Sequence, residues 1–193
     1  MDEMEEDVRV YKTKKSISEA FIQLLHEKDF NQITIKDICT RSLTSKSTFY
    51  SHFLDKYDLL EKLVKKHADT FEREIARRFE SMKQGNVGEV IETMIDQAAV
   101  HKTEIAALLN VHVSAADLRV EFEVILYNAC RAYLEKEPAE LAVSIDYLAK
   151  LYAANAMALL QWTLQNGKDA SAVALADSMQ RFIFDQVRRS HGW

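Results

Sequence analysis

Residues 34–56 decide the fold of this chain, and they read TIKDICTRSLTSKSTFYSHFLDK. Thr34 is a favourable helix N-cap, and the isoleucines after it share one helical face, so a short helix is predicted over 35–41. A tight turn comes next, and a second short helix is predicted over about 45–50, with Thr44 or Ser45 as its cap. This second helix carries hydroxyls, a lysine and a tyrosine, which suit a row of phosphates and the floor of a DNA groove.

The composition of the whole chain predicts an all-α protein. Its 193 residues are 48% apolar, with four glycines and one proline, and most apolar residues recur at helical spacing. One or two domains with a sizeable core are expected.

The chain has no run of about 18 apolar residues, so no membrane span is expected. The acidic N-terminus lacks a signal-peptide pattern, which favours a cytoplasmic location. Cys39 and Cys130 are expected to be reduced core residues.

The net charge of −5 conceals an uneven distribution along the chain. Residues 8–66 hold 12 Lys and Arg against 7 Asp and Glu, a balance of +5, whereas residues 67–193 hold 13 against 18, a balance of −5. The first seven residues add a further −5. A basic front on an acidic body is typical of a nucleic-acid binder with a separate regulatory domain, although ordinary fluctuation would also produce it.

About nine helices are predicted, in two domains. Residues 8–55 contain a first helix over about 10–28 and the two short helices described above. A helix over about 56–79, about 35 Å long, opens the second domain, residues 56–193. Residues 82–88 form the clearest linker, because they contain two glycines. The other helices are expected over about 87–101, 103–111 after a Thr103 cap, 115–135 after a Ser114 cap, 138–165 from Pro138 to the stop at Gly167, and 171–189.

The last two of these helices are apolar over more of their surface than one core requires. One side of the longer helix carries Ile145, Leu148, Leu151, Tyr152, Leu159 and Trp162, and alanines cover much of the rest. The final helix presents Leu175, Met179, Phe182, Ile183 and Val187. A helix that is apolar on nearly all sides is buried on two fronts, so we expect a homodimer with a four-helix interface. The alternative is that both helices complete the core of the monomer.

The short helix over 45–50 has the chemistry of a DNA-reading surface. Phe49 and Phe53 can anchor it, which leaves its polar residues free to project. Lys46 can displace counterions from phosphate or donate to a guanine edge, and the methyl of Thr48 can meet a thymine methyl.

Four flanking residues complete this candidate interface. Tyr50 and His52 can each donate a hydrogen bond to a phosphate oxygen. The alternatives are a core aromatic for Tyr50 and an uninvolved solvent-exposed side chain for His52. Thr34 and Lys56 lie at predicted helix N-termini, where free backbone amides and the helix dipole favour an anion.

Over residues 10–60 the chain resembles the DNA-binding domain of the TetR/AcrR family of transcriptional regulators. The family pattern is a capping Thr, a support helix with Ile, then Ser-Lys/Arg-Gly/Ser-Thr-Phe/Leu-Tyr-x-His/Tyr-Phe, and then a Lys and a Leu pair. This chain supplies Thr34, Ile35, Ile38, Ser45, Lys46, Ser47, Thr48, Phe49, Tyr50, His52, Phe53, Lys56, Leu59 and Leu60. The remaining helices fit the family's regulatory domain in number and length.

The resemblance implies a dimeric transcriptional regulator, a repressor more often than an activator, that binds a palindromic duplex operator. By family role, the phosphate-contacting residues are Thr34, Ser45, Tyr50, His52 and Lys56. Lys46 and Thr48 are the best candidates for contacts to bases, with Thr44 and Ser47 as further candidates. A family glycine in the turn is replaced by Leu43. Either Leu43 adopts a strained positive φ, at a cost of about 1 kcal/mol or more, or the turn differs and Leu43 packs inward.

The resemblance also implies a small-molecule pocket in the second domain, whose occupation would release the protein from its operator. Some family members have little or no such pocket. Candidate lining residues are His67, Phe71, His101, His112, Tyr127, Tyr152, Asn155 and Trp162. Each of the polar ones is also explained as a hydrogen-bonded core residue. The sequence identifies no effector and predicts no resident cofactor or metal.

Two other classes of function are weaker. A helical metal or redox protein would need ligand pairs such as Glu-x-x-His, and the chain has no such pair. A protein with this fold could also act through protein contacts alone, for example as a co-activator that does not bind DNA. Enzymatic activity is not expected, because the chain lacks a phosphate-binding glycine loop, a nucleophile elbow and a paired carboxylate motif.

Overall fold

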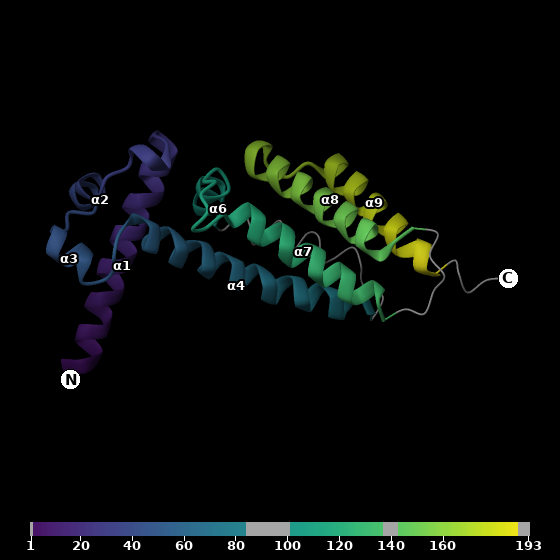
Figure 1. Cartoon of the computed structure of the whole chain (residues 1–193), viewed down its shortest axis with the longest axis horizontal. Helices are drawn as coiled ribbons and strands as arrows, with labels where there is room; N and C mark the ends of the chain where they lie inside the picture. Colours follow the sequence, from purple (N-terminus) through teal and green to yellow (C-terminus); the bar gives the residue numbers. More distant parts are fainter. Residues whose placement is uncertain (1, 84–100, 137–142, 189–193) are drawn as a thin grey trace. The chain divides into compact units, whose positions relative to one another are not determined.

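The computed structural model describes residues 2–83, 101–136 and 143–188, and every regular element in these ranges is helical (Figure 1). The elements are α1 (Asp2–Glu27), the 3-10 turn η1 (Phe30–Gln32), α2 (Ile35–Arg41), α3 (Lys46–Tyr50), α4 (Lys56–Lys83), α6 (Lys102–Leu108), α7 (Leu118–Leu134), α8 (Ile145–Asn166) and α9 (Ala170–Arg188). The predicted all-α class is confirmed. The expected helix over 87–101 lies outside the described residues, apart from its last residue.

The chain divides into two compact units. The first contains residues 1–67 and 103–118, and the second contains residues 68–102 and 119–193. The long helix α4 contributes its first part, up to His67, to the first unit and the rest to the second. The functional roles predicted for 8–55 and 56–193 remain predictions.

The core of the first unit is built by α1, α2, α3 and the start of α4. The predicted inner stripe of α1 is buried at Ile17 and Phe21, which are fully inaccessible. Phe30 of η1 meets Phe21 edge-on, with 6.2 Å between ring centroids. Burial of each such side chain stabilises the fold by about 2 kcal/mol. Phe49 of α3 is also fully buried, so this short helix is held to the unit by its aromatic anchor.

The core of the second unit is aromatic. Phe71 of α4 stacks on Phe122 of α7, with ring centroids 4.0 Å apart. Further along α4, Phe79 joins Tyr133, Tyr152 and Phe184, whose centroids all lie within 6.2 Å of its own. Cys130 is fully buried, and burial raises the pKa of its thiol to about 12. Cys39 is buried in the first unit, so both thiols are core residues, as expected.

Several predicted helix boundaries were wrong at the N-terminal side. α1 begins at Asp2 rather than near residue 10, which is consistent with acidic residues stabilising the start of a helix. α6 begins at Lys102, so Thr103 is not its cap. α7 begins at Leu118 rather than after Ser114, because Val113 and Ala116 form a small β-bridge there.

Two further differences concern the ends of long helices. α4 continues to Lys83, so the start of the predicted linker is helical, and the rest of that linker lies outside the described residues. α8 begins at Ile145 with Ser144 as its cap, and Pro138 lies outside the described residues. The predicted stop is confirmed, because Gly167 follows α8 with a φ of 85°.

No helix among the described residues combines the length and the apolar character that crossing a lipid bilayer would require.

Candidate nucleic-acid interface

The support helix α2 is fixed by a reciprocal cap. The Thr34 hydroxyl accepts from the Asp37 backbone N–H at 3.2 Å, and the Asp37 carboxylate accepts from the Thr34 backbone N–H at 2.9 Å. Asp37 also accepts from Lys28 Nζ at 2.7 Å. These donors, with Lys28 the strongest, hold the pKa of the Asp37 carboxyl far below its usual range. The cap leaves Thr34 exposed at the N-terminus of α2.

The candidate reading helix α3 shows its polar side to solvent. Ser45 caps it, because the Ser45 hydroxyl accepts from the Thr48 N–H at 3.0 Å. The Ser45 and Thr48 hydroxyls are also 2.8 Å apart and share a hydrogen bond. Lys46 and Ser47 are exposed, whereas Thr44 and Thr48 are partly buried. The five-residue helix therefore presents one cation and several hydroxyls on a side opposite its Phe49 anchor.

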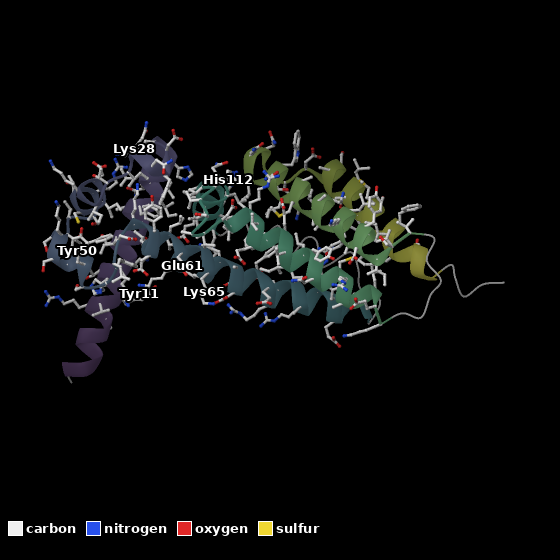
Figure 2. All side chains as sticks on the ribbon, in the orientation of Figure 1. Tyr11, Lys28, Tyr50, Glu61, Lys65 and His112 are labelled. Carbon is white, nitrogen blue, oxygen red and sulfur yellow. The ribbon has the colours of Figure 1, made fainter. Side chains whose placement is uncertain are left out.

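Tyr50 and His52 lie at the end of this helix. Tyr50 is 54% exposed, so it is not a core aromatic, and its ring meets Phe49 edge-on at 5.6 Å between centroids. Figure 2 labels Tyr50 on α3. His52 is partly buried, and its ring lies beside that of Phe53 at 6.5 Å between centroids. Both side chains keep polar atoms available at the surface of the first unit.

The turn between α2 and α3 contains the clearest backbone strain among the described residues. Leu43 has a φ of 53° and is 93% exposed. The alternative in which Leu43 packs inward is therefore wrong, and the strained alternative is confirmed. A left-handed conformation costs a non-glycine residue about 1 kcal/mol or more. The turn keeps this geometry because the Thr44 N–H donates to the Cys39 carbonyl at 3.0 Å and the Ser42 and Thr44 hydroxyls share a 2.7 Å hydrogen bond.

Lys56, at the start of α4, points its ammonium group into the protein. Its Nζ donates to the carbonyls of Phe30 at 2.9 Å, Asn31 at 3.2 Å and Ile33 at 2.9 Å. It also lies 4.6 Å from the centroid of the Phe30 ring, a cation–π distance. Burial, and secondarily the charge of Lys28, lower the pKa of Lys56. All three ammonium hydrogens are used internally, so the group left for an outside anion is the Lys56 backbone N–H.

The first turn of α4 is capped by neighbouring carboxylates. Asp55 accepts from the backbone N–H groups of Tyr57 at 2.8 Å and Asp58 at 2.9 Å. Asp58 accepts from the Leu54 N–H at 2.9 Å and pairs with Lys62 at 2.8 Å. The Lys62 hydrogen bond is the main reason that the pKa of Asp58 is lowered. These caps fix the direction in which α4 leaves the helix-turn-helix unit.

One candidate that the sequence analysis did not name is Lys36, in the first turn of α2. It is exposed, and no carboxylate within the described ranges pairs with it. Residue type and spacing do not distinguish Lys36 from the other lysines of the chain. Its distinction is the absence of an internal partner, which depends on three-dimensional contacts.

The residues proposed for an effector pocket differ in their exposure and in their partners. His67 is buried in the first unit and lies 2.8 Å from the Glu104 carboxylate. His112 is exposed and pairs with Asp117 at 2.8 Å, and His101 is exposed. Trp162 is 48% exposed. The roles of these residues in ligand binding remain predictions.

The other pocket candidates belong to the second unit. Phe71 is engaged in the stack on Phe122, and Tyr127 donates to Asp146 at 2.7 Å, which raises the pKa of Tyr127. Asn155 is partly buried and accepts from Gln180 at 3.1 Å. Tyr152 is fully buried, burial raises its pKa to about 12, and its hydroxyl has no hydrogen-bond partner among the described residues.

A buried polar network crosses the second unit beside Tyr152. Arg78 of α4 is 3% exposed and donates to the side-chain oxygen of Gln180, which is 1% exposed. The Gln180 side-chain N–H donates to the side-chain oxygen of Asn155 at 3.1 Å. The Arg78 guanidinium carbon lies 5.6 Å from the centroid of the Tyr152 ring. An arginine in an aromatic core is costly without such contacts, so this network constrains how α4, α8 and α9 pack.

The outer surface of α8 and α9 is apolar. Leu151 and Trp162 of α8 are 42% and 48% exposed, and Leu175 and Phe182 of α9 are 64% and 61% exposed. The predicted stripe on α9 divides, because Ile183 is buried whereas Leu175, Met179 and Phe182 face solvent. The homodimer through these two helices, and the alternative in which they only complete the monomer core, remain predictions.

The geometry defines the class of protein. A buried aromatic anchor, a capped support helix and an exposed polar second helix form a helix-turn-helix module. Residues 17–63 match the family model described as "Bacterial regulatory proteins, tetR family". Over these residues the chain matches this family of transcriptional regulators, as the resemblance predicted.

Known proteins are similar to this chain to different extents. Over 61 residues it is 38% identical to the uncharacterized HTH-type transcriptional regulator YxbF of Bacillus subtilis (strain 168), a segment that covers 31% of this chain and 16% of YxbF. Over almost its whole length it is similar to a TetR transcriptional regulator from Streptococcus agalactiae 2603V, with 25% identity, a TM-score of 0.65, and 94% and 99% of the two chains covered.

A third similarity is to the TetR-family repressor FadR of Thermus thermophilus, whose structure was solved in complex with lauroyl-CoA. The two chains are 16% identical, with a TM-score of 0.50, and 90% of this chain and 94% of FadR are covered. At this identity the likeness concerns the fold alone.

Proposed function

We propose that this protein is a dimeric, sequence-specific DNA-binding regulator, with a repressor role as the first expectation. The observation that carries the proposal is α3, whose buried Phe49 leaves Lys46 and Ser47 exposed. A short helix anchored on one side and polar on the other can enter the major groove of duplex DNA. In this proposal residues 8–55 bind DNA, and residues 56–193 provide dimerisation and regulation.

The contacts divide into positioning and reading. We assign phosphate contacts to Thr34, Ser45, Tyr50 and His52, and to Lys56 through its backbone N–H rather than its occupied ammonium group. Lys46 and Thr48 are assigned to base edges, with Thr44 and Ser47 as further candidates. The shared hydrogen bond between the Ser45 and Thr48 hydroxyls orients both side chains before DNA arrives.

The dimer is proposed to form through α8 and α9. Leu151 and Trp162 on one helix and Leu175, Met179 and Phe182 on the other give an exposed apolar surface, which is a liability for an isolated monomer. A two-fold axis through this surface would make a four-helix interface and place two copies of α3 on one operator. Palindromic DNA would match that symmetry.

The effector part of the proposal rests on the interior of the second unit. The Tyr152 hydroxyl is buried without a hydrogen-bond partner in the described part of the chain, beside the ring-stacked Arg78. A ligand with a polar group could satisfy this hydroxyl, and FadR, a fold relative, binds lauroyl-CoA. Tyr152→Phe removes the unpaired hydroxyl, so we expect it to stabilise the protein by about 1 kcal/mol and to weaken any effector response.

The decisive experiment is affinity selection of genomic DNA fragments on the purified full chain, followed by sequencing. Enrichment of one inverted repeat supports a DNA-binding regulator. A protein that acts only through protein contacts, the alternative function, would enrich no sequence. That outcome would overturn the proposal.

A further inference from the structure

The lysines and arginines of residues 8–62 fall into two groups, and the first group is neutralised within the protein. Lys28 pairs with Asp37 at 2.7 Å, Arg41 forms a two-pronged pair with Glu27, and Lys62 pairs with Asp58 at 2.8 Å. Lys56 is bound to three carbonyls. Lys15 lies 3.8 Å from Glu19 on the same helix. Cations already held in this way offer little to a phosphate group.

The second group has no ionic partner within the described residues. Its members are all exposed, and they are Arg9, Lys12 and Lys14 on α1, Lys36 on α2, and Lys46 on α3. Lys36 and Lys46 belong to the helix-turn-helix itself, where an unpaired cation is expected to meet phosphate or base. The three on α1 lie outside the helices assigned to DNA contact, so their free charge needs its own explanation.

A hydrogen bond shows which side of α1 faces the end of α2. The Ser16 hydroxyl donates at 3.1 Å to the carbonyl of Ser42, the residue that ends α2 immediately before the turn into α3. Arg9 and Lys12 lie seven and four residues before Ser16, so all three share one helical face. Lys14 lies on the opposite side, about 160° around the helix from Ser16 at 100° per residue.

The distance along α1 suits an extension of the same surface. With a rise of about 1.5 Å per residue, Lys12 is about 6 Å and Arg9 about 10 Å along the axis from the Ser16 contact. In Figure 1 the N-terminal turns of α1 run on past α3, so this helix continues beyond the module. Figure 2 labels Tyr11 on this part of α1, and Tyr11 is 66% exposed.

We propose that Arg9 and Lys12 form an additional phosphate-binding surface, which extends the DNA interface from α2 and α3 onto α1. The inference rests on the proposed function, and its ligand is the sugar–phosphate backbone beside the groove that α3 enters. Two unpaired cations on the Ser16 face can each displace a condensed counterion from duplex DNA. The acidic residues at positions 2, 3, 5, 6 and 7 limit this attractive stretch to the turns after them.

The test uses the full-length protein, the operator recovered by genomic selection, and binding titrations at several salt concentrations. In the Arg9→Gln/Lys12→Gln variant we expect the slope of log K against log salt to fall by about 1.8 for each protomer bound, or about 3.6 for a dimer. Affinity at low salt should fall at least tenfold. Lys14→Gln/Lys15→Gln is the matched control, because it removes the same charge from the same helix but from other sides.

The outcomes separate this inference from the proposed function. If the wild type binds its operator and Arg9→Gln/Lys12→Gln leaves the slope unchanged, the α1 surface is wrong and the regulator remains. If the control loses as much slope as the test variant, the effect is general charge, and the inference is again overturned. If the wild type selects no DNA, the proposed function itself fails. Ethylation interference should lose the outermost phosphates in the test variant only, and helix content by circular dichroism should be equal in both.

Discussion

The outer faces of α2–α3 and of α8–α9 are both exposed, but they expose opposite chemistry. On α3 the apolar residue is buried, and a lysine, hydroxyls and a tyrosyl ring reach solvent, with caps holding the backbone. On α8–α9 the outward residues are leucine, methionine, phenylalanine and tryptophan. The first surface suits a charged and hydrated partner, and the second suits a partner that excludes water. Binding at the first should weaken as the salt concentration rises, whereas association at the second should not weaken with salt.

The largest effect is expected from a charge placed in the apolar face. Phe182→Glu would require an unpaired carboxylate in the proposed dimer interface, so the dimer dissociation constant should rise at least about a hundredfold, or about 3 kcal/mol. Sedimentation equilibrium measures this directly. Arg181→Glu is a useful control, because that neighbour is exposed and pairs with Asp177 of its own helix. A Phe182→Glu protein that remains dimeric at micromolar concentration would contradict the interface.

The next largest effect concerns the support of the polar face. Lys56→Met leaves three carbonyls without their ammonium donor, so the free energy of unfolding should fall by about 2 kcal/mol. Lys62→Met removes a half-exposed ammonium group that pairs with Asp58, donates to the His52 carbonyl at 3.3 Å and lies 5.1 Å from the Phe53 ring centroid. It should change the free energy of unfolding by less than about 1 kcal/mol. Urea denaturation of both variants gives the comparison. Equal losses of unfolding free energy in the two variants would mean that the three Lys56 hydrogen bonds stabilise the protein no more than the Lys62 contacts do.

A smaller effect is expected from the reading helix. Lys46→Ala should weaken operator binding about tenfold and lower the salt slope by about one unit for each protomer. The dimer constant should be unchanged, because the two faces use different interactions. A mobility-shift titration at several salt concentrations tests this. Unchanged affinity and slope would remove Lys46 from the interface.

Relief of backbone strain should have a modest effect of opposite sign. Leu43→Gly should stabilise the protein by about 0.5–1 kcal/mol, because glycine accepts the positive φ and the exposed leucyl side chain loses no burial. Leu43→Ala keeps the strain and should be close to neutral. Thermal unfolding measures both. A destabilised Leu43→Gly would show that the leucyl side chain has contacts of its own.

The smallest effect is a pH dependence at the cap of α2. The pKa of Asp37 is lowered in the folded state, so its contribution to stability is present above the unfolded value of about 3.9 and is lost as pH falls toward the folded value. Asp37→Asn should therefore be less stable than the wild type at pH 7, and the difference should shrink below about pH 4. Denaturation curves at several pH values show this. A constant difference across that range would contradict the coupling.

The contrast also explains what the sequence could predict. The α2 cap at Thr34 and the stop at Gly167 were predicted correctly, and Ser45 was one of the two caps predicted for α3, because each depends on one residue and its nearest neighbours. The starts of α7 and α8 were missed, because a β-bridge and the competing Ser144 cap decide them. Which lysines are free, and where Leu43 points, depend on tertiary contacts that residue spacing does not encode.

Lys56 has a mechanical consequence. Its ammonium group connects the first turn of α4 to three carbonyls of the segment between α1 and α2. A torque applied to this end of α4 is then transmitted to α1 and α2 instead of being absorbed in a flexible joint. The helix-turn-helix module would then rotate as one body. The side chains on α3 would keep their mutual spacing while their orientation changes.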